Sequence, residues 1–575
     1  MDLLITLGHS SSAILIKDGR VLEGYEEERH NREKGCSVFP IMSIKKCLKD
    51  KEFSKENNTI YVSHWFDDFN FRNNNHDKIQ NKYWNEEYIK SIQEKFGFNV
   101  KLLNNNFTHH DAHAYAVKSF YDYHSETPQD SLILVADGFG NKQEVISLYN
   151  LKYKDGKGKI SSIKKIKGYS KSLGLFYQYA TSFCGMKENQ DEYKFLGYES
   201  HIEEVLGKTQ AEVLKTLSLK YSNMFIDSLE EKEISVNSDS EYINLKDLAK
   251  VKEFYNSIFN DINNSFAFNK DDDNFSLRIV IGNFIQTVIE NVCIYLVEKY
   301  SSGSLLVNGG IFYNVKLNNR LARISDSFCV FPLAGDQGAA IGLYANDGKS
   351  LDYSDLFWGK RTISKEVETL ENLPENVEVY DNKLDMVKRI CSLIKDNSIP
   401  QIIVGNMEFG PRALCHTTTL SIPTKDNVET INSYNKRNTV MPMAPVMLRK
   451  NLGYFFNKEQ YAKTVGSDKY MILTYDYKIP YNDLYSGIMH KYPSENLFSG
   501  RPQVIEDNNT TISLVLEELD PYGLKALVNT SYNIHGKPIV FSVEDAIKDF
   551  SYQLVRAEEL SIKKPFLLIG EYKDE

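Results

Sequence analysis

The sequence predicts an α/β protein of two or three domains. Two apolar strands end in glycine-rich turns that lead into helices, in SLLVNGGIFYN (304–314) and in FPLAGDQGAAIG (331–342). Residues 3–28 alternate in the manner of a hairpin, with the Asp18-Gly19 pair at its turn. At 575 residues, the chain is long enough for several buried cores.

The composition excludes several classes of protein. The chain is 42% apolar and 25% charged, which is typical of globular proteins. Its formal net charge of −10, without a dense Lys/Arg stripe, argues against a large nucleic-acid surface but allows a local basic pocket for a small phosphorylated ligand. The seven cysteines are scattered and form no CxxC pair, which argues against a disulfide framework or a structural zinc site.

Two apolar segments bear on where in the cell the protein is located. The N-terminus, MDLLITLGHS, has an early Asp and no basic region, so it does not read as a signal peptide. Polar residues interrupt the apolar segment 279–300, which we therefore interpret as a core helix and not as a membrane span. The sequence predicts a cytoplasmic protein without a membrane partner.

The composition changes at about residues 345–400, where the sequence becomes acidic and loop-like. We place a domain boundary there, which divides the chain into residues 1–350 and 351–575. A strand that leads into a glycine-proline-arginine loop, QIIVGNMEFGPRAL (401–414), opens the second region.

A pair of histidines is the first candidate site. In the segment 108–120, THHDAHAYAVKSF, His109 and His113 lie one helical turn apart and could bind one metal ion. The alternative is an ordinary amphipathic helix with one buried and one exposed histidine. Two histidines need further ligands. Asp137 follows a buried strand and Asp336 lies between glycines, although a plain turn also explains each of them.

Basic residues in separate loops form a second candidate site. Three loops of the second region carry Arg412, Lys436 with Arg437, and Arg501. Arginines that converge from different loops can bind phosphate or carboxylate groups bidentately. Taken singly, each is explained as a surface charge, and the charge run EEERHNREKG with Lys34 is explained as a solvated face.

Motifs in both halves carry a resemblance to a known family. They are GHSSSAILIKDG, EEERHNREK, HHDAHAYAVKSF, VADGFG, SLGLFYQYAT, EYKFLGY, NGGIFYNVKLNNRL, GDQGAAIG, MEFGPRAL, NKRNTVMPMAP, SGRPQV and NTSYNIHGKPIV. In this order they resemble the ATP-dependent O-carbamoyltransferases, the family of the tobramycin and nodulation-factor carbamoylating enzymes. The resemblance covers nearly the whole chain.

The resemblance implies a fold for each region. Residues 1–350 would form an actin/Hsp70/sugar-kinase domain like that of the tRNA threonylcarbamoyl-transfer enzymes. Residues 351–575 would form a YrdC-like α/β domain that makes carbamoyladenylate. Whether the last helix packs back on the first domain is left open, as is a homodimer.

The resemblance also implies a reaction. The second domain would take carbamoyl phosphate and Mg-ATP and make carbamoyladenylate, phosphate and pyrophosphate. The first domain would transfer the carbamoyl group to a hydroxyl of a small acceptor such as a sugar, an antibiotic or a hydroxymethylated nucleotide. A divalent metal would assist, Fe(II) by resemblance, with Zn(II) and Mn(II) as alternatives that the same ligands suit.

The residues at the family's motif positions then acquire expected roles. The metal ligands would be His109, His113 and Asp336, and the catalytic residues His9, Lys34 and Asp137. The first domain would bind the nucleotide through Asn308, Gly309, Gly310 and Asn314, largely by backbone contacts. The second domain would bind carbamoyl phosphate and ATP through Arg412, Lys436, Arg437, Arg501, Asn529 and Ser531.

The sequence departs from the family pattern at several positions. Asn406, Thr417 and Met441 stand in motifs where the family has arginines, and Ser10 stands where it has aspartate. The loss of arginines favours one alternative, a nucleotide-binding regulator that has lost catalysis. A threonylcarbamoyl-transferring relative that modifies tRNA is a second alternative, which the acidic charge balance disfavours.

Overall fold

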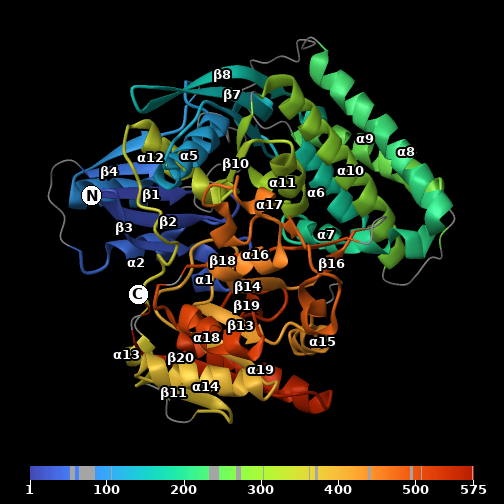
Figure 1. Ribbon diagram of the computed structural model, residues 1–575. Coiled ribbons are helices and arrows are strands. Elements are labelled where there is room, and N and C mark those ends of the chain that lie inside the picture. The colour runs from blue at the N-terminus through green and yellow to red at the C-terminus, as the bar shows by residue number, and fades with distance from the viewer. Residues whose placement is uncertain are drawn as a thin grey trace.

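The protein was analysed as a computed structural model (Figure 1). The structure describes residues 1–575 except 52–57, 64–84, 105, 232–244, 267, 269–273, 302, 362, 369–372, 438–441, 493–496, 507, 573 and 575. Met441, one of the departures noted above, lies outside the described residues.

The first sheet has five strands in the order β3-β2-β1-β4-β5. Their bounds are β1 Asp2–Thr6, β2 Ser12–Lys17, β3 Arg20–Glu26, β4 Asn58–Val62 and β5 Phe98–Leu102. Strands β1, β2 and β3 are antiparallel, and the turn between β2 and β3 is Asp18-Gly19, both with positive φ. The predicted hairpin is therefore confirmed, with the turn chemistry that such a pair favours.

The second sheet repeats this topology, with the order β10-β9-β6-β7-β8. Its strands are β6 Ser131–Ala136, β7 Glu144–Lys154, β8 Lys157–Lys167, β9 Ser304–Asn308 and β10 Ser327–Val330. In both sheets, three antiparallel strands are followed by two parallel ones. This duplicated arrangement is the actin/Hsp70/sugar-kinase fold that the resemblance implied.

Two helices pack together between these sheets. Helix α5 (His109–His124) lies on the second sheet, and α12 (Ala339–Asn346) lies on β1 and β4 of the first. They meet so closely that a Cβ added to Gly342 would lie 1.7 Å from the carbonyl oxygen of Ala112. The position of α5, which carries both candidate histidines, therefore depends on residue 342 being a glycine.

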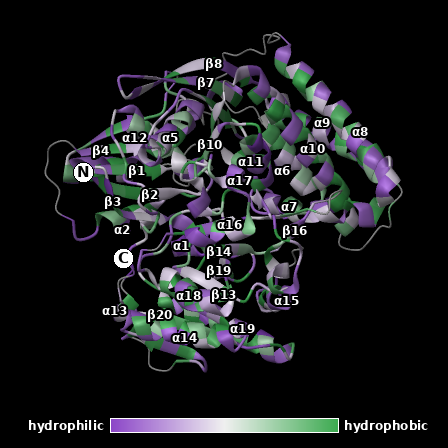
Figure 2. Ribbon diagram, in the orientation of Figure 1, coloured by the Kyte–Doolittle hydropathy of each residue, from purple (hydrophilic) through white to green (hydrophobic). Residues whose placement is uncertain are grey.

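Outer helices complete the first domain. Helix α10 (Phe275–Tyr300) packs against α6 (Leu173–Phe183), α8 (Ile202–Glu230), α9 (Leu245–Asn264) and α11 (Val315–Arg323). Figure 2 shows many polar residues along the outer helix α8, whereas β1 and β2 are largely hydrophobic. Among the described residues, α10 alone is long and apolar enough to cross a membrane, and 67% of its most apolar window is buried. It is a core helix, as the sequence predicts.

The second domain is built on a seven-stranded sheet in the order β11-β20-β12-β13-β19-β14-β18. The strands are β11 Val377–Tyr380, β12 Ile399–Ile403, β13 Thr417–Ser421, β14 Ala444–Leu448, β18 Gln503–Ile505, β19 Leu527–Ser531 and β20 Pro565–Gly570. Helices α14 (Lys383–Lys395) and α18 (Thr511–Leu519) share one hydrophobic cluster with this sheet, and α19 (Val543–Glu559) shares another. This α/β domain agrees with the predicted YrdC-like class.

The two domains contact each other through segments from both. The backbone of Phe328 in β10 bonds to Lys463 and Val465 of the second region (2.8 and 2.9 Å). Helix α19 lies on the seven-stranded sheet, yet its Asp549 pairs with Arg32 of the first domain (2.9 Å). The division of the chain at residue 350 remains a prediction.

The contact between α5 and α12 gives a first testable expectation. Gly342→Ala should lower the free energy of unfolding by about 1–3 kcal/mol, because the new methyl group meets the Ala112 carbonyl. In an open helix the same change would stabilise by up to about 1 kcal/mol. Urea denaturation measures the effect. Gly453→Ala, where the nearest atom to the added Cβ is 3.4 Å away, serves as the control and should change little.

Candidate active site

Four side chains that could bind a metal converge in the first domain. They are His109, His113, Asp137 and Asp336, and one ligand atom from each lies within 4.8 Å of the others. Nε2 of His109 is 3.2 Å from Asp137 Oδ2 and 3.2 Å from Asp336 Oδ1. Nε2 of His113 is 3.1 Å from Nε2 of His109. The structure thus brings together the two histidines and the two carboxylates that the sequence singled out separately.

Each ligand is positioned by the end of an element. His109 and His113 lie one turn apart at the start of α5, where Thr108 and Asp111 form a reciprocal capping box. Asp137 directly follows β6, and Asp336 begins the short 3₁₀ segment Asp336–Gly338. The three segments meet because β6, β9 and β10 are parallel neighbours, so their carboxyl ends lie at one edge of the sheet, and α5 packs on all three strands.

Glycines allow the loop after β9 to approach these ligands. Gly309 has φ of 109°, and a Cβ there would lie 2.2 Å from the Ala136 carbonyl oxygen. The Gly310 N–H donates to Asp137 Oδ1 (3.2 Å). The Asn308 amide donates to the His113 carbonyl (2.7 Å), and the Asn314 side chain caps α11. Both asparagine side chains are engaged within the protein, so any nucleotide contact from this loop falls to its backbone.

The donor set suits a divalent metal. Bonds of about 2.0–2.2 Å to nitrogen and oxygen place neighbouring ligand atoms about 3–3.6 Å apart, which matches the separations of His109 from its three partners. Imidazole and carboxylate together favour Fe(II), Zn(II) or Mn(II). The residues present therefore fit the divalent metal that the family resemblance implies.

Charge in this group is balanced by protons. Burial disfavours the charged form of His109, but the Asp336 charge and hydrogen bonds to Asp137 and Asp336 outweigh it and raise the pKa of His109 to about 10. Burial raises the pKa of Asp336, yet the charge of His109 and hydrogen bonds to both histidines lower it to about 2. At neutral pH, His109 therefore carries a positive charge beside the two carboxylates.

His9 and Lys34 lie on loops next to the metal-ligand group. Gly8, beside His9, would place a Cβ 4.0 Å from Asp336 Oδ2, and Gly35 would place one 2.9 Å from Cε1 of His9. Lys34 is partly buried, and its ammonium lies 5.3 Å from the ring centroid of Tyr193. Burial lowers the pKa of Lys34; the charges of Glu28 and Asp191 oppose this shift, and those of Arg437 and Arg412 add to it.

Cations from the second domain face Lys34. Burial lowers the pKa of Arg412, Arg437 and Arg501, and Arg412 also lowers that of Arg501. The negative form of Tyr193 would raise the pKa of all three, so its hydroxyl lies within electrostatic range of the three guanidinium groups. In the described part of the chain, none of these four cations forms an ion pair with a carboxylate. We call Lys34, Arg412, Arg437 and Arg501 the cation cluster.

Neutral groups hold the cluster in place. Arg437 donates to Thr530 Oγ1 (2.6 Å), to the Ser531 carbonyl (2.6 Å) and to Asn533 Oδ1 (3.0 Å). The Arg412 guanidinium lies 5.9 Å from the ring centroid of Tyr313, and its Nε is buried without a hydrogen-bond partner among the described residues. These contacts fix the guanidinium groups of Arg437 and Arg412 without neutralising them.

Two predicted residues differ from this pattern. Lys436 is exposed and lies over the ring of Tyr552 at 5.2 Å, and no contact with the cluster is seen in the described residues. Asn529 is buried and donates to the Ala413 carbonyl (2.9 Å), while the Thr418 hydroxyl donates to its Oδ1. Ser531 lies beside Arg437 and donates to Asn533 Oδ1 (2.6 Å).

The structure adds two residues that sequence reasoning missed. The Tyr193 ring lies under the Lys34 ammonium, and only its position in the EYKFLGY motif hinted at a role. Arg361 donates to Thr417 Oγ1, and its Nε and Nη1 lack hydrogen-bond partners among the described residues. Burial lowers the pKa of Arg361 to about 10. It lies in the loop-like boundary segment, where no motif marks it.

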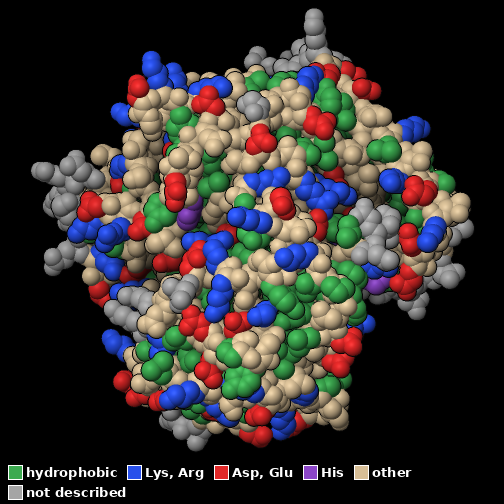
Figure 3. All heavy atoms as spheres, viewed as in Figure 1, with side chains coloured by type: hydrophobic (Ala, Val, Ile, Leu, Met, Phe, Trp, Pro, Cys, Tyr) green, Lys and Arg blue, Asp and Glu red, His purple; other side chains and the backbone are tan. Residues whose placement is uncertain are grey.

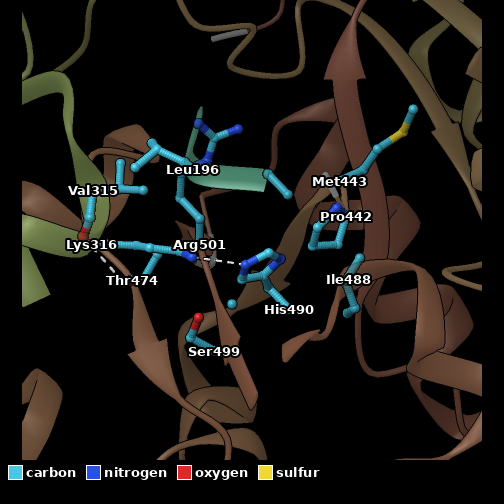
Figure 4. A pocket seen from close by; sticks show the side chains of 12 residues that line it. Leu196, Val315, Lys316, Pro442, Met443, Thr474, Ile488, His490, Ser499 and Arg501 are labelled. Atoms are coloured by element: carbon cyan, nitrogen blue, oxygen red, sulfur yellow. Dashed lines mark hydrogen bonds between the residues drawn. The ribbon is translucent and has the colours of Figure 1, made fainter. Parts of the chain in front are cut away.

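A small cavity of about 40 Å³ adjoins the cation cluster at Arg501. Figure 4 shows residues from both domains around it, with Lys316 bonded to His490 (2.8 Å). On the face drawn in Figure 3, Lys and Arg side chains are mixed with Asp and Glu and form no continuous basic stripe. The cation cluster lies at the domain junction, with Lys34 from the first domain and three arginines from the second.

Comparisons with known proteins identify the family of the chain. The family model described as carbamoyltransferase N-terminus matches residues 3–344, and the one described as carbamoyltransferase C-terminus matches residues 391–564. An uncharacterized protein of Methanocaldococcus jannaschii is 26% identical over 96% of each chain.

Two further relatives have informative names. Nodulation protein NolNO of Sinorhizobium fredii is 22% identical over 96% of this chain and 78% of its own length. A 3'-hydroxymethylcephem-O-carbamoyltransferase of Amycolatopsis lactamdurans is 23% identical over 44% of this chain and 46% of its own.

Replacement of a histidine ligand should lower metal affinity, whereas replacement of the neighbouring histidine, which is not a ligand, should not. We expect His113→Gln to lower affinity for a divalent metal by at least about 100-fold, because an amide replaces an imidazole ligand. His110→Asn is the matched control, since His110 lies on the same turn but bonds to Ser147 (2.8 Å). Metal content after anaerobic loading, measured by mass spectrometry, should fall in the first variant alone. Equal metal content in both variants would contradict the assignment.

Metal affinity should also depend on pH. A metal must displace the proton of His109, whose pKa of about 10 keeps it charged at neutral pH. We expect the apparent affinity to rise about tenfold per pH unit, for each proton displaced, between pH 6 and 8. Calorimetric titration with Zn²⁺ or Mn²⁺ at several pH values measures this slope. A flat profile would show that these histidines do not bind the metal.

Proposed function

The chain belongs to the carbamoyltransferase family, and from this premise we propose that it is an ATP-dependent O-carbamoyltransferase acting on a small hydroxylated metabolite. One observation carries the proposal: at the junction of two domains, four cations that form no ion pair with a described carboxylate lie near a metal-ligand group. Such a junction suits a substrate that brings several phosphate charges and then passes an activated group onward.

In the first half-reaction, carbamoyl phosphate and ATP would give carbamoyladenylate, phosphate and pyrophosphate. Arg412, Arg437 and Arg501 would bind the phosphate groups, since guanidinium groups recognise phosphate oxygens in pairs. Each is partly desolvated, which strengthens its attraction for an anion. Arg361 supplies a further guanidinium where Thr417 interrupts the family pattern.

In the second half-reaction, the carbamoyl group would pass to the acceptor hydroxyl. The carbamoyl carbon is a weak electrophile, so a good leaving group, AMP, is needed. Lys34 would neutralise the leaving phosphate, His9 would contact the carbamoyl group, and the backbone of residues 308–314 would bind the adenosine. A metal held by His109, His113, Asp137 and Asp336 would supply Lewis-acid stabilisation.

The metal and the acceptor follow from chemistry and relatives. We propose Fe(II), with Zn(II) and Mn(II) suited to the same ligands. A relative named for a hydroxymethylcephem and one named for nodulation support an acceptor with a free hydroxyl. The reaction would take place in the cytoplasm, where ATP is present, and the seven cysteines are unpaired, as such a compartment requires.

The missing arginines favour a second candidate, a nucleotide-binding regulator. The same experiment decides between the two. Metal-loaded protein is incubated with ATP and carbamoyl phosphate without acceptor, and products are identified by mass spectrometry. Carbamoyladenylate together with pyrophosphate, formed only when carbamoyl phosphate is present, supports the enzyme. Binding of ATP without either product supports the regulator and rejects the enzyme.

The cation cluster gives a matched pair of variants. We expect Arg437→Gln to lower kcat/KM for pyrophosphate release by about 100-fold, or about 2.7 kcal/mol of transition-state stabilisation, because a charged phosphate contact is lost. Lys436→Gln, the adjacent exposed residue, should change it less than threefold. If the two variants behave alike, the pyrophosphate-forming site does not include Arg437.

A further inference from the structure

The charge run that follows β3 lies at the domain junction and has no part in the reaction proposed above. The sequence alone explains this run as a solvated face, but in the structure Glu26 and Arg29 are each only 3% exposed. Arg29, in helix α1 (Glu27–Asn31), donates to Glu26 Oε2 through Nη2 (2.7 Å) and Nε (3.1 Å). Because desolvation offsets most of the attraction in a buried ion pair, stability alone does not account for this one.

The ion pair binds one residue of the second domain through both of its backbone polar groups. The Gly410 N–H donates to Glu26 Oε2 (3.1 Å), and the Gly410 carbonyl accepts from Arg29 Nη2 (2.6 Å). Gly410 has φ of 103°, and a Cβ there would lie 2.7 Å from Cδ2 of Leu333, three residues before Asp336. Gly410 is therefore held between the charge run and the segment that leads to the metal-ligand group.

Gly410 lies two residues before Arg412, a member of the cation cluster. Pro411 stands between them, and its ring restricts the backbone, so the orientation of Gly410 largely sets the direction in which Arg412 leaves the loop. The side chain of Arg412 has few restraints of its own: its Nε is buried without a hydrogen-bond partner among the described residues. The position of this guanidinium group therefore depends on the backbone that the ion pair holds.

A second carboxylate fixes the remaining nitrogen of Arg29. Nη1 of Arg29 lies 3.4 Å from Glu28 Oε1, and Glu28 Oε2 accepts from the Gly35 N–H (2.7 Å), directly after Lys34. The three guanidinium nitrogens thus contact Glu26, Glu28 and the Gly410 carbonyl, which link the Lys34 loop to the Arg412 loop. Arginine suits this task because its planar fork presents donors in several fixed directions, which a lysine ammonium does not.

We propose that Arg29 is a positioning residue for the phosphate site: paired with Glu26 in the first domain, it sets the place of Arg412 in the second. This inference rests on the proposed function, in which Arg412 binds phosphate groups. Each guanidinium nitrogen of Arg29 already has a partner within the protein, so its effect on a bound anion passes through Arg412. A displacement of about 1 Å in such a group is enough to lower the rate by about 100-fold.

The test measures binding of pyrophosphate to the full-length protein by calorimetric titration. The test variant carries Glu26→Gln and Arg29→Met together, so its net charge is unchanged and no buried charge is left unpaired. We expect its affinity for pyrophosphate to fall at least about tenfold, because Arg412 loses its fixed position. In an Arg412→Gln background, the same two changes should lower the affinity by less than about twofold, since the residue through which they act is gone.

Another ion pair across the domain junction provides the matched control. Arg32 directly follows α1, pairs with Asp549 (2.9 Å) and donates to the Ile539 carbonyl (3.1 Å). Arg32→Met together with Asp549→Asn removes a pair of the same kind and leaves the contacts of Gly410 in place. We expect this control to bind pyrophosphate within about twofold of the wild-type affinity.

The outcomes separate this inference from the proposed function. If wild-type protein does not bind pyrophosphate, or Arg412→Gln binds it as tightly as wild type, the proposed phosphate site itself fails. If Arg412→Gln weakens binding but the test variant does not, or if their effects add, or if the control weakens binding equally, Arg29 does not position Arg412.

A single variant decides the question should the test variant fail to fold. Arg29→Lys keeps the charge but not the planar fork. It should weaken pyrophosphate binding in the wild-type background and leave it unchanged in the Arg412→Gln background. Wild-type affinity, or an equal loss in both backgrounds, would overturn the inference.

Discussion

Positive charge that forms no ion pair among the described residues is the constraint on which the domain junction depends. Burying a cation without a partner is costly, and the lowered pKa values of Lys34, Arg412, Arg437 and Arg501 express this cost. The fold sustains it by holding the side chains with neutral groups such as Thr530 and Asn533. A bound anion would offset the free-energy cost of burying these cations, so the arrangement favours the binding of phosphate groups.

The metal-ligand group depends on a different constraint, the close contact of two helices. Helix α5 reaches Asp137 and Asp336 because Gly342 lets α12 approach the Ala112 carbonyl. Helices α5 and α12 lie between duplicated sheets, so the ligands come from elements that both halves of the fold support. The metal group lies in the first domain and three of the four cations lie in the second, with Lys34 and Tyr193 between them.

Local sequence signals predicted those features of the structure that depend on residues close together in the chain. The Asp18-Gly19 turn, the one-turn spacing of His109 and His113, and the strand-end position of Asp137 depend on neighbouring residues alone. The family resemblance added Asp336. Contacts between distant segments could not be read in this way: Tyr193 under the Lys34 ammonium, Arg361 beside Thr417, and the engaged side chains of Asn308 and Asn314 follow from tertiary packing.

The central claim is that the cation cluster binds an anionic ligand. Calorimetric titration of the full-length protein with pyrophosphate, beside the Arg501→Gln variant, tests it most directly. We expect wild-type protein to bind one pyrophosphate, more weakly as salt is added, and the variant to bind at least about tenfold more weakly. Equal affinity in both proteins, or no binding by wild-type protein at low salt, would contradict the account.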